Sequence, residues 1–273
     1  MELRKSQTFF LGLQHVLAMY AGAVIVPIIV GSSLNLTTMQ IAYLIGADLL
    51  TSGIATLLQV WRNRFFGIGL PVVLGCTFTA VFPMIAIGKE LGLGAIYGAI
   101  ITSGLIVFII SHWFGKLVRF FPPVVTGSIV TVIGVTLVPV AMNNLAGGLG
   151  SPDFGSVMNL SLGFAVLAFI LILNRLFKGY IQAISVLLGL IVGTIAAFFL
   201  GMVDFAPVAE ATWAHIPQPF YFGLPTFHAS AILTMTIVAM VSMVESTGVF
   251  LALGEICDRK LTPKDLAHGY RAE

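Results

Sequence analysis

Residues 69–83 read GLPVVLGCTFTAVFP, and this short stretch decides how the rest of the chain is interpreted. It lies in an apolar segment long enough to cross a membrane, yet its two prolines each remove a backbone donor and its two glycines weaken a helix. We therefore expect an extended piece that leads into a half-helix near Thr77. Irregular backbone at membrane depth is tolerated where protein buries it or where it lines a cavity, and broken helices mark the central sites of transporters. A helix that is merely kinked is the alternative.

The composition indicates that lipid is the solvent of the whole chain. Of its 273 residues, 58% are hydrophobic and 9% are charged, whereas a soluble domain carries roughly 25% charged residues. The net charge of +2 gives no reason to expect a nucleic-acid partner. Cys76 and Cys257 form no C-x-x-C pair, so we expect them to pack as small apolar residues and to form neither a disulfide nor a metal site.

The sequence predicts an all-α protein that crosses the membrane many times. A membrane helix needs about 20 mostly apolar residues, which gives about eight spans here. They cover residues 9–31, 40–60, 68–88, 91–114, 121–142, 157–173, 183–203 and 229–256. The loops between these spans alternate between the two sides of the membrane, and all lysines and arginines except Lys89 fall on one side. By the positive-inside rule, we expect a multi-pass protein of the cell membrane with its N-terminus in the cytoplasm.

Three ionisable side chains stand out inside the predicted spans. Glu245 lies near the middle of the last span, His15 lies beside Gln14 in the first, and Asp48 lies in the second. A charge at membrane depth is costly, so such residues usually have a partner or a function. A carboxylate can accept hydrogen bonds from the N–H groups of a purine or pyrimidine ring, and burial can bring its protonation near neutral pH. An imidazole can likewise change its protonation near neutral pH.

Each of these residues also has a simpler interpretation. Glu245 could be a structural carboxylate paired across helices, but no lysine or arginine lies within the spans to pair with it. His15 could make an ordinary interhelical hydrogen bond. Asp48 could be a packing or gating acid that is hydrogen-bonded to a nearby serine or threonine. The sequence therefore favours a binding role most clearly for Glu245.

Three motifs together resemble the nucleobase–ascorbate transporters, also called nucleobase:cation symporter-2, and within that family the bacterial xanthine permeases. They are QHVLAMY at residues 14–20, GLPVVLGCTF at 69–78 and VESTG at 244–248. The resemblance covers the whole chain. It implies fourteen spans in two inverted seven-helix repeats, a homodimer at full length, and uptake of xanthine or uric acid coupled to protons, with no cofactor.

The resemblance also implies roles for individual residues. It implies that Glu245 binds the base ring, that the backbone and ring of Phe78 contact the base, that Thr77 lies close by, and that His15 supports the site. Further support is expected from Gln14, Gly75, Cys76, Ser246 and Asp48, and no metal is expected. Many members carry Asp or His four residues after the glutamate, where this chain has Val249.

The family's domain organisation can be placed on the sequence. The resemblance implies that residues 1–120 form core spans one to four and that 121–204 form gate spans five to seven. Residues 205–228 would form an outer loop, and 229–273 would form core span eight with a cytoplasmic tail. The family's span-ten motif is absent from these residues. We therefore expect the N-terminal part of a longer transporter, without spans nine to fourteen.

Three alternatives are considered beside a purine transporter. A uracil or other nucleobase permease would share the same site, and an anion transporter of the same fold is a second alternative, although a buried Glu245 would repel its substrate. An intramembrane enzyme that uses Glu245 and His15 as acid and base is the weakest alternative. No nucleophile–base pair or metal-ligand spacing accompanies them in the sequence.

Overall fold

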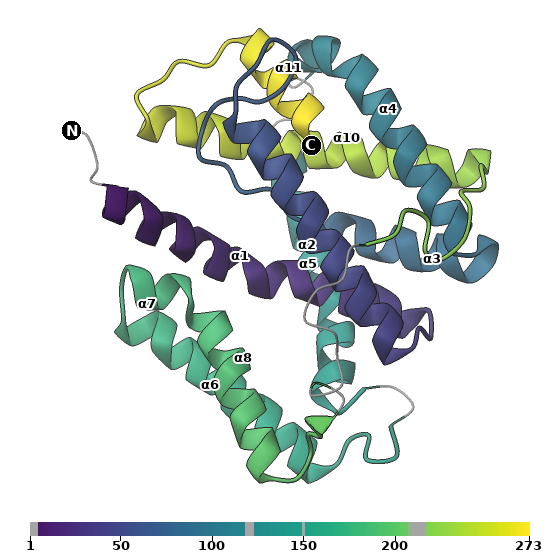
Figure 1. The fold of residues 1–273 in the computed structure, drawn as a ribbon, viewed down its shortest axis with the longest axis vertical. Coiled ribbons are helices and arrows are strands. Elements are labelled where there is room, and N and C mark those ends of the chain that lie inside the picture. The colour runs from purple at the N-terminus through teal and green to yellow at the C-terminus, as the bar shows by residue number, and fades with distance from the viewer. Residues whose placement is uncertain (1–4, 118–122, 149–150, 207, 209–216) are drawn as a thin grey trace. The chain divides into compact units, whose positions relative to one another are not determined.

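The computed structural model describes residues 5–117, 123–148, 151–206, 208 and 217–273, and all the regular structure in these residues is helical (Figure 1). Five helical segments are long and apolar enough to cross a membrane. They are Thr8–Ser33 in α1 (Lys5–Ser33), α2 (Thr38–Val60), Leu93–Phe114 in α4 (Leu93–Leu117), α6 (Val157–Leu176) and α10 (Ala229–Ile256). The prediction of an all-helical protein with several membrane helices is confirmed.

The remaining predicted spans are helical over only part of their length or include side chains outside the described part. The third is represented by α3 (Val81–Leu91), and the seventh by α8 (Ser185–Phe199), which follows the single turn α7 (Tyr180–Ala183). The fifth corresponds to α5 (Pro123–Leu145), several of whose side chains lie outside the described part. The count of about eight spans therefore stays a prediction.

The third predicted span is broken where its prolines and glycines indicated. After α2, residues 71–77 form no regular secondary structure, and the short 3-10 helix η1 (Phe78–Ala80) leads directly into α3. Thr77 has extended backbone angles and caps η1, because its hydroxyl accepts a hydrogen bond from Thr79 N at 3.2 Å. The prediction of a broken span with a half-helix that begins near Thr77 is confirmed. We call residues 67–77 the arm.

The chain divides into two compact units, Met1–Gly22 with Gly134–Ile216, and Ala23–Ile133 with Pro217–Glu273. In the first unit, α6 packs closely against α8. Gly189 and Gly193 make this possible, because a side chain at either position would collide with Ile170 or Val166 of α6. The G-x-x-x-G spacing thus brings two helices together, which is its usual role in membranes.

The core of the second unit is built around the arm. Ile68, Leu70 and Val72 of the arm are buried among apolar side chains of α4, α10 and α11 (Pro263–Ala272). On the other side of the break, α3 packs with α4 and α10 through small residues and Met235. The first half of the arm is therefore packed largely against protein, although Pro71 is exposed, and protein contact of this kind is what irregular backbone at membrane depth requires.

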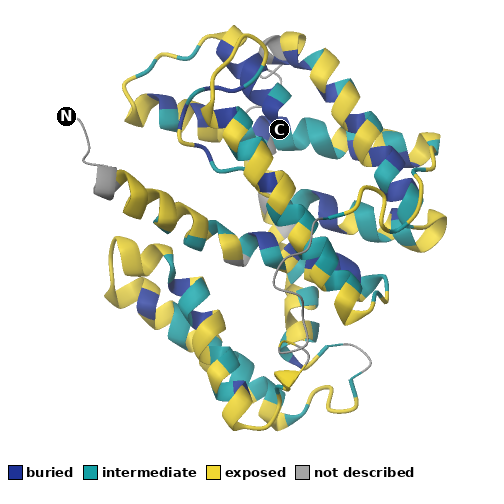
Figure 2. Ribbon diagram, viewed as in Figure 1, coloured by how far each residue is buried: buried dark blue, intermediate teal, exposed yellow. Residues whose placement is uncertain are grey.

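The segment after α10, which the sequence suggested was a tail, folds onto the second unit as α11. Thr262 and Asp265 form a capping box at its start, and Pro263 occupies the first turn, where it needs no hydrogen-bond partner. Figure 2 shows α11 coloured almost entirely as buried. The ring of Tyr270 is fully buried and meets the ring of Phe114 edge-on at 5.5 Å. Thus α11 is part of the packing that encloses the arm.

Candidate functional site

The break in the third span places a hydroxyl beside the carboxylate of α10. Thr79 Oγ1 lies 3.5 Å from Oε2 of the half-buried Glu245, at the outer limit of a hydrogen bond. The same hydroxyl lies 2.7 Å from Oγ1 of Thr77. The two threonines therefore form a short polar chain that ends at Glu245. The start of the half-helix is also the end at which free backbone N–H groups favour a negative charge.

A cavity of about 890 Å³ lies in the second unit, within the 300–1,000 Å³ that small-molecule sites usually have. Its wall includes five of the predicted site residues, one of which directly follows Glu245. These are Asp48, Gly75, Cys76, Thr77 and Ser246. Most of the remaining wall is apolar. Glu245 and Phe78 do not line the cavity, although each directly neighbours a residue that does.

Asp48 and Cys76 meet in the cavity wall. The Cys76 thiol is in hydrogen-bond contact with the carboxyl group of Asp48 and lies 3.4 Å from the carbonyl oxygen of Ala23. Thr51 donates to the backbone oxygen of Asp48 at 3.0 Å and not to its carboxylate. Within the described part of the chain, Asp48 Oδ2 is buried without a hydrogen-bond partner. The carboxyl group of Asp48 therefore lies beside the Cys76 thiol, with one of its oxygens unsatisfied.

The remaining predicted site residues are less directly connected to this cavity. Phe78 is half-buried in η1, next to Thr77. Gln14 and His15 belong to the first unit, where His15 Nδ1 lies 2.9 Å from the carbonyl oxygen of Leu11, one helical turn earlier. The side chain of His15 is exposed. Base contact by Phe78, and support of the site by Gln14 and His15, stay predictions.

The sequence did not single out two aromatic residues of the cavity wall, Tyr97 of α4 and Phe222 of the loop before α10. Their rings lie 6.5 Å apart. The loop can reach α4 because Gly94 and Gly98 leave no side chain in its path, and Thr226 N donates to Gly94 O at 2.9 Å. The only available signal was this pair of glycines four residues apart. The sequence predicted an outer loop here, and the described part of this loop packs on α4.

The site shows no sign of metal chemistry in the described residues, where no group of three His, Cys, Asp or Glu side chains could hold an ion. What the residues offer is hydrogen bonding. A carboxylate, two hydroxyls and a helix start lie together at a break in the membrane-spanning structure. Such a set can accept and donate hydrogen bonds to a planar polar solute, and the carboxylate can exchange a proton.

The sequence matches the permease family over residues 6–273. It is 65% identical to the nucleobase transporter PlUacP of Paenibacillus larvae subsp. larvae over 99% of this chain and 62% of that protein. It is 61% identical to the xanthine permease of Bacillus subtilis over 98% of this chain and 61% of that protein. It is 63% identical to the uric acid permease PucK of Bacillus subtilis over 98% of this chain and 62% of that protein. The chain thus spans about three fifths of the length of these curated relatives.

Proposed function

The chain belongs to the permease family, and from that premise we propose that it forms the purine-binding part of a proton-coupled transporter of xanthine or uric acid. Family membership makes it a multi-pass membrane permease and not an enzyme, and the resemblance to nucleobase transporters is confirmed. The substrate, the coupling ion and the direction of transport are part of the proposal. So are the placement in the cell membrane with a cytoplasmic N-terminus and the homodimeric assembly.

The observation that carries the proposal is the contact between Glu245 and Thr79 at the break in the third span. A purine presents ring N–H donors and carbonyl acceptors along one edge. Glu245 can accept from the N–H groups, while the hydroxyls of Thr77 and Thr79 can each donate or accept. This arrangement suits a polar ring better than an inorganic anion, because the ring offers N–H donors to the carboxylate and an inorganic anion offers none. A binding role for Glu245 is therefore favoured over an anion site.

The cavity supports a planar substrate of this kind. Its largely apolar wall carries few polar groups, and those few would fix the orientation of the ring. Tyr97 and Phe222 supply aromatic surface on which a base can stack. Proton coupling is supported by Glu245 and Asp48, because a carboxyl group at membrane depth can take up and release a proton.

Uptake by cells that lack their own purine permeases tests the proposal. The full-length protein should take up labelled xanthine in a saturable way. Excess unlabelled xanthine or uric acid should compete, a protonophore should abolish accumulation, and inorganic anions should have no effect. Competition by uracil alone would favour the alternative of a pyrimidine permease. Competition by anions alone would overturn the purine assignment and favour an anion transporter of the same fold.

A further inference from the structure

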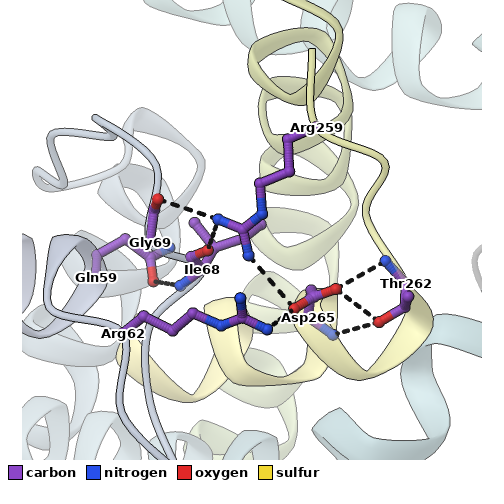
Figure 3. Close-up of polar contacts among 7 residues, drawn as sticks. All are labelled: Gln59, Arg62, Ile68, Gly69, Arg259, Thr262 and Asp265. Carbon is purple, nitrogen blue, oxygen red and sulfur yellow. Dashed lines mark hydrogen bonds and ion pairs between the residues drawn. The ribbon is translucent and has the colours of Figure 1, made fainter. Parts of the chain in front are cut away.

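The end of the arm away from Glu245 is held by charged side chains (Figure 3). We propose that Arg62, Arg259 and Asp265, which we call the latch, position the arm so that Thr77 and Thr79 meet Glu245. On this view the latch residues touch no substrate, and they set the affinity of the site through the backbone of the arm. The uptake experiment that tests this inference rests on the proposed function. The cysteine-alkylation experiment rests on the geometry alone.

Arg259 makes the direct connection to the arm. Its Nη1 donates to the carbonyl oxygens of Ile68 at 2.8 Å and Gly69 at 3.1 Å. Ile68 is fully buried, and an unpaired buried carbonyl costs about 1–3 kcal/mol. Arg259 is itself fixed to the end of α10, because its backbone N donates to Gly254 O at 2.7 Å. One end of the arm is therefore tied to the same helix that carries Glu245.

Asp265 holds the latch together from α11. Its Oδ1 lies 2.6 Å from Nη2 of Arg62 and 3.5 Å from Nη2 of Arg259. Its Oδ2 accepts from Thr262 N at 3.0 Å and from Thr262 Oγ1 at 2.7 Å. A single carboxylate thus connects the segment after α2, the segment after α10 and the start of α11 (Figure 3). Asp265 is about 10% exposed and Arg259 27%, whereas Arg62 is 54% exposed, so solvent screens the pair with Arg259 less than the pair with Arg62.

Backbone contacts complete the attachment of the arm. Gly67 N donates to His268 O of α11 at 2.9 Å, and Gly69 N donates to Gln59 O of α2 at 3.0 Å. The fully buried Gln59 also accepts from Ile68 N through Oε1 at 3.3 Å. The first three residues of the arm are therefore held from both sides. Gly69 has φ of +69°, and a side chain there would press on Arg62 and Arg259.

Packing and hydrogen bonds along the arm connect the latch to the threonines of the site. Leu70 and Val72 are buried in the core of the unit, and Leu74 N donates to Thr56 Oγ1 of α2 at 2.9 Å. Five residues later, Thr79 faces Glu245. The segment after α10 thus contacts the start of the arm through Arg259, and α10 itself contacts Thr79 of η1, just beyond the arm, through Glu245. A shift of the arm at Gly69 would move the threonine hydroxyls relative to the carboxylate.

Loss of the latch should therefore lower affinity without changing the transport step itself. When only a fraction of molecules has the arm in the binding position, the apparent dissociation constant rises by the inverse of that fraction. Molecules that have bound substrate have the arm in place and turn over normally. A residue that served folding alone would instead lower the amount of protein and leave the affinity of the surviving molecules unchanged.

The first experiment compares Arg259→Ala, Arg259→Lys and Lys260→Ala in the full-length protein, with uptake normalised to the amount in the membrane. Lys260 is the matched control, since it is the exposed cation next in sequence. We expect Arg259→Ala to raise the KM for xanthine by roughly tenfold, the factor for one lost charge-assisted hydrogen bond, with kcat unchanged. Arg259→Lys should recover part of this, and Lys260→Ala should match the wild type. An unchanged KM for Arg259→Ala would overturn the proposal.

The second experiment follows the arm itself and needs no transport. Alkylation of Cys76 is measured by peptide-resolved mass spectrometry in a Cys257→Ser background, because Cys257 is exposed. A released arm should make Cys76 react several-fold faster in Arg259→Ala, and Lys260→Ala should match the background. Faster alkylation in a protein that transports no purine would support the latch and refute the proposed function. Equal rates alongside normal purine uptake would refute the latch alone.

A third variant covers the case in which Arg259→Ala does not reach the membrane. Asp265→Asn keeps an oxygen to cap Thr262 and removes the charge that Arg62 and Arg259 share. We expect a rise in KM and faster alkylation of Cys76, each smaller than in Arg259→Ala. Wild-type KM and wild-type alkylation of Cys76 in this variant would overturn the proposal.

Discussion

Glu245 and Thr79 are separated by 166 positions in the sequence, yet their side-chain oxygens lie 3.5 Å apart. The contact exists because the third predicted span stops being extended at Thr77 and begins a new helix whose start faces α10. A continuous helix would satisfy its own backbone and would present no such end. The break therefore creates the polar site.

The first prediction concerns the carboxylate. Glu245→Gln in the full-length protein should reduce xanthine uptake roughly 10- to 100-fold, because the amide carries no charge, exchanges no proton and has one acceptor oxygen. Uptake normalised to the amount in the membrane is the measurement. Glu255→Gln is the control, since Glu255 is exposed near the end of α10 and should retain uptake. Wild-type uptake by Glu245→Gln would leave only a structural role for this residue.

The second prediction separates function from packing at Asp48. Removing the charge of a buried, unsatisfied carboxylate relieves an unfavourable interaction. We therefore expect Asp48→Asn to lower uptake while its Tm in detergent equals or exceeds that of the wild type. Uptake and a thermal-shift assay on the same preparation measure both. A lower Tm with normal uptake would make Asp48 a packing residue, as its simpler interpretation holds.

The third prediction concerns pH and the latch. Burial opposes ionisation of Asp265, but hydrogen bonds from Thr262 and the charges of Arg62 and Arg259 outweigh it and hold the pKa of this carboxyl below its usual value. A lowered folded-state pKa contributes stability above the unfolded pKa of about 3.9, and this stability is lost as the pH falls through the folded pKa. The latch should thus be intact at neutral pH.

The measurement is the Tm of the wild type and of Asp265→Asn as a function of pH. The wild type should be the more stable of the two at neutral pH, by an amount that stays constant down to about pH 5 and shrinks below about pH 4. A difference that disappears between pH 6 and 8 would show that another group controls the latch.

The fourth prediction concerns orientation. Lys264 is exposed at the start of α11, on the side where the basic residues gather, so the positive-inside rule places it in the cytoplasm. A cysteine introduced by Lys264→Cys should resist a membrane-impermeant reagent in intact cells and react after the cells are opened. Rapid labelling in intact cells would reverse the topology.

Local features of the sequence predicted the membrane helices and the broken third span, and they made Glu245 a candidate for binding. Each follows from residues close together in the chain, because hydrophobic length fixes a membrane helix, proline and glycine interrupt one, and a carboxylate among apolar residues is costly wherever the helix packs. The same information could not settle the seventh predicted span, where α8 is shorter than its apolar segment. Apolar length alone does not mark where a helix begins and ends.

Only the tertiary structure decided which side chains meet. It joined Asp48 to Cys76, brought Phe222 to the cavity, folded the supposed tail into α11 and placed Asp265 between two arginines. In membrane helices nearly every face is apolar, so the pattern of residues does not tell which face packs against which neighbour. These contacts depend on how the helices assemble around the arm, and that arrangement is a property of the folded chain.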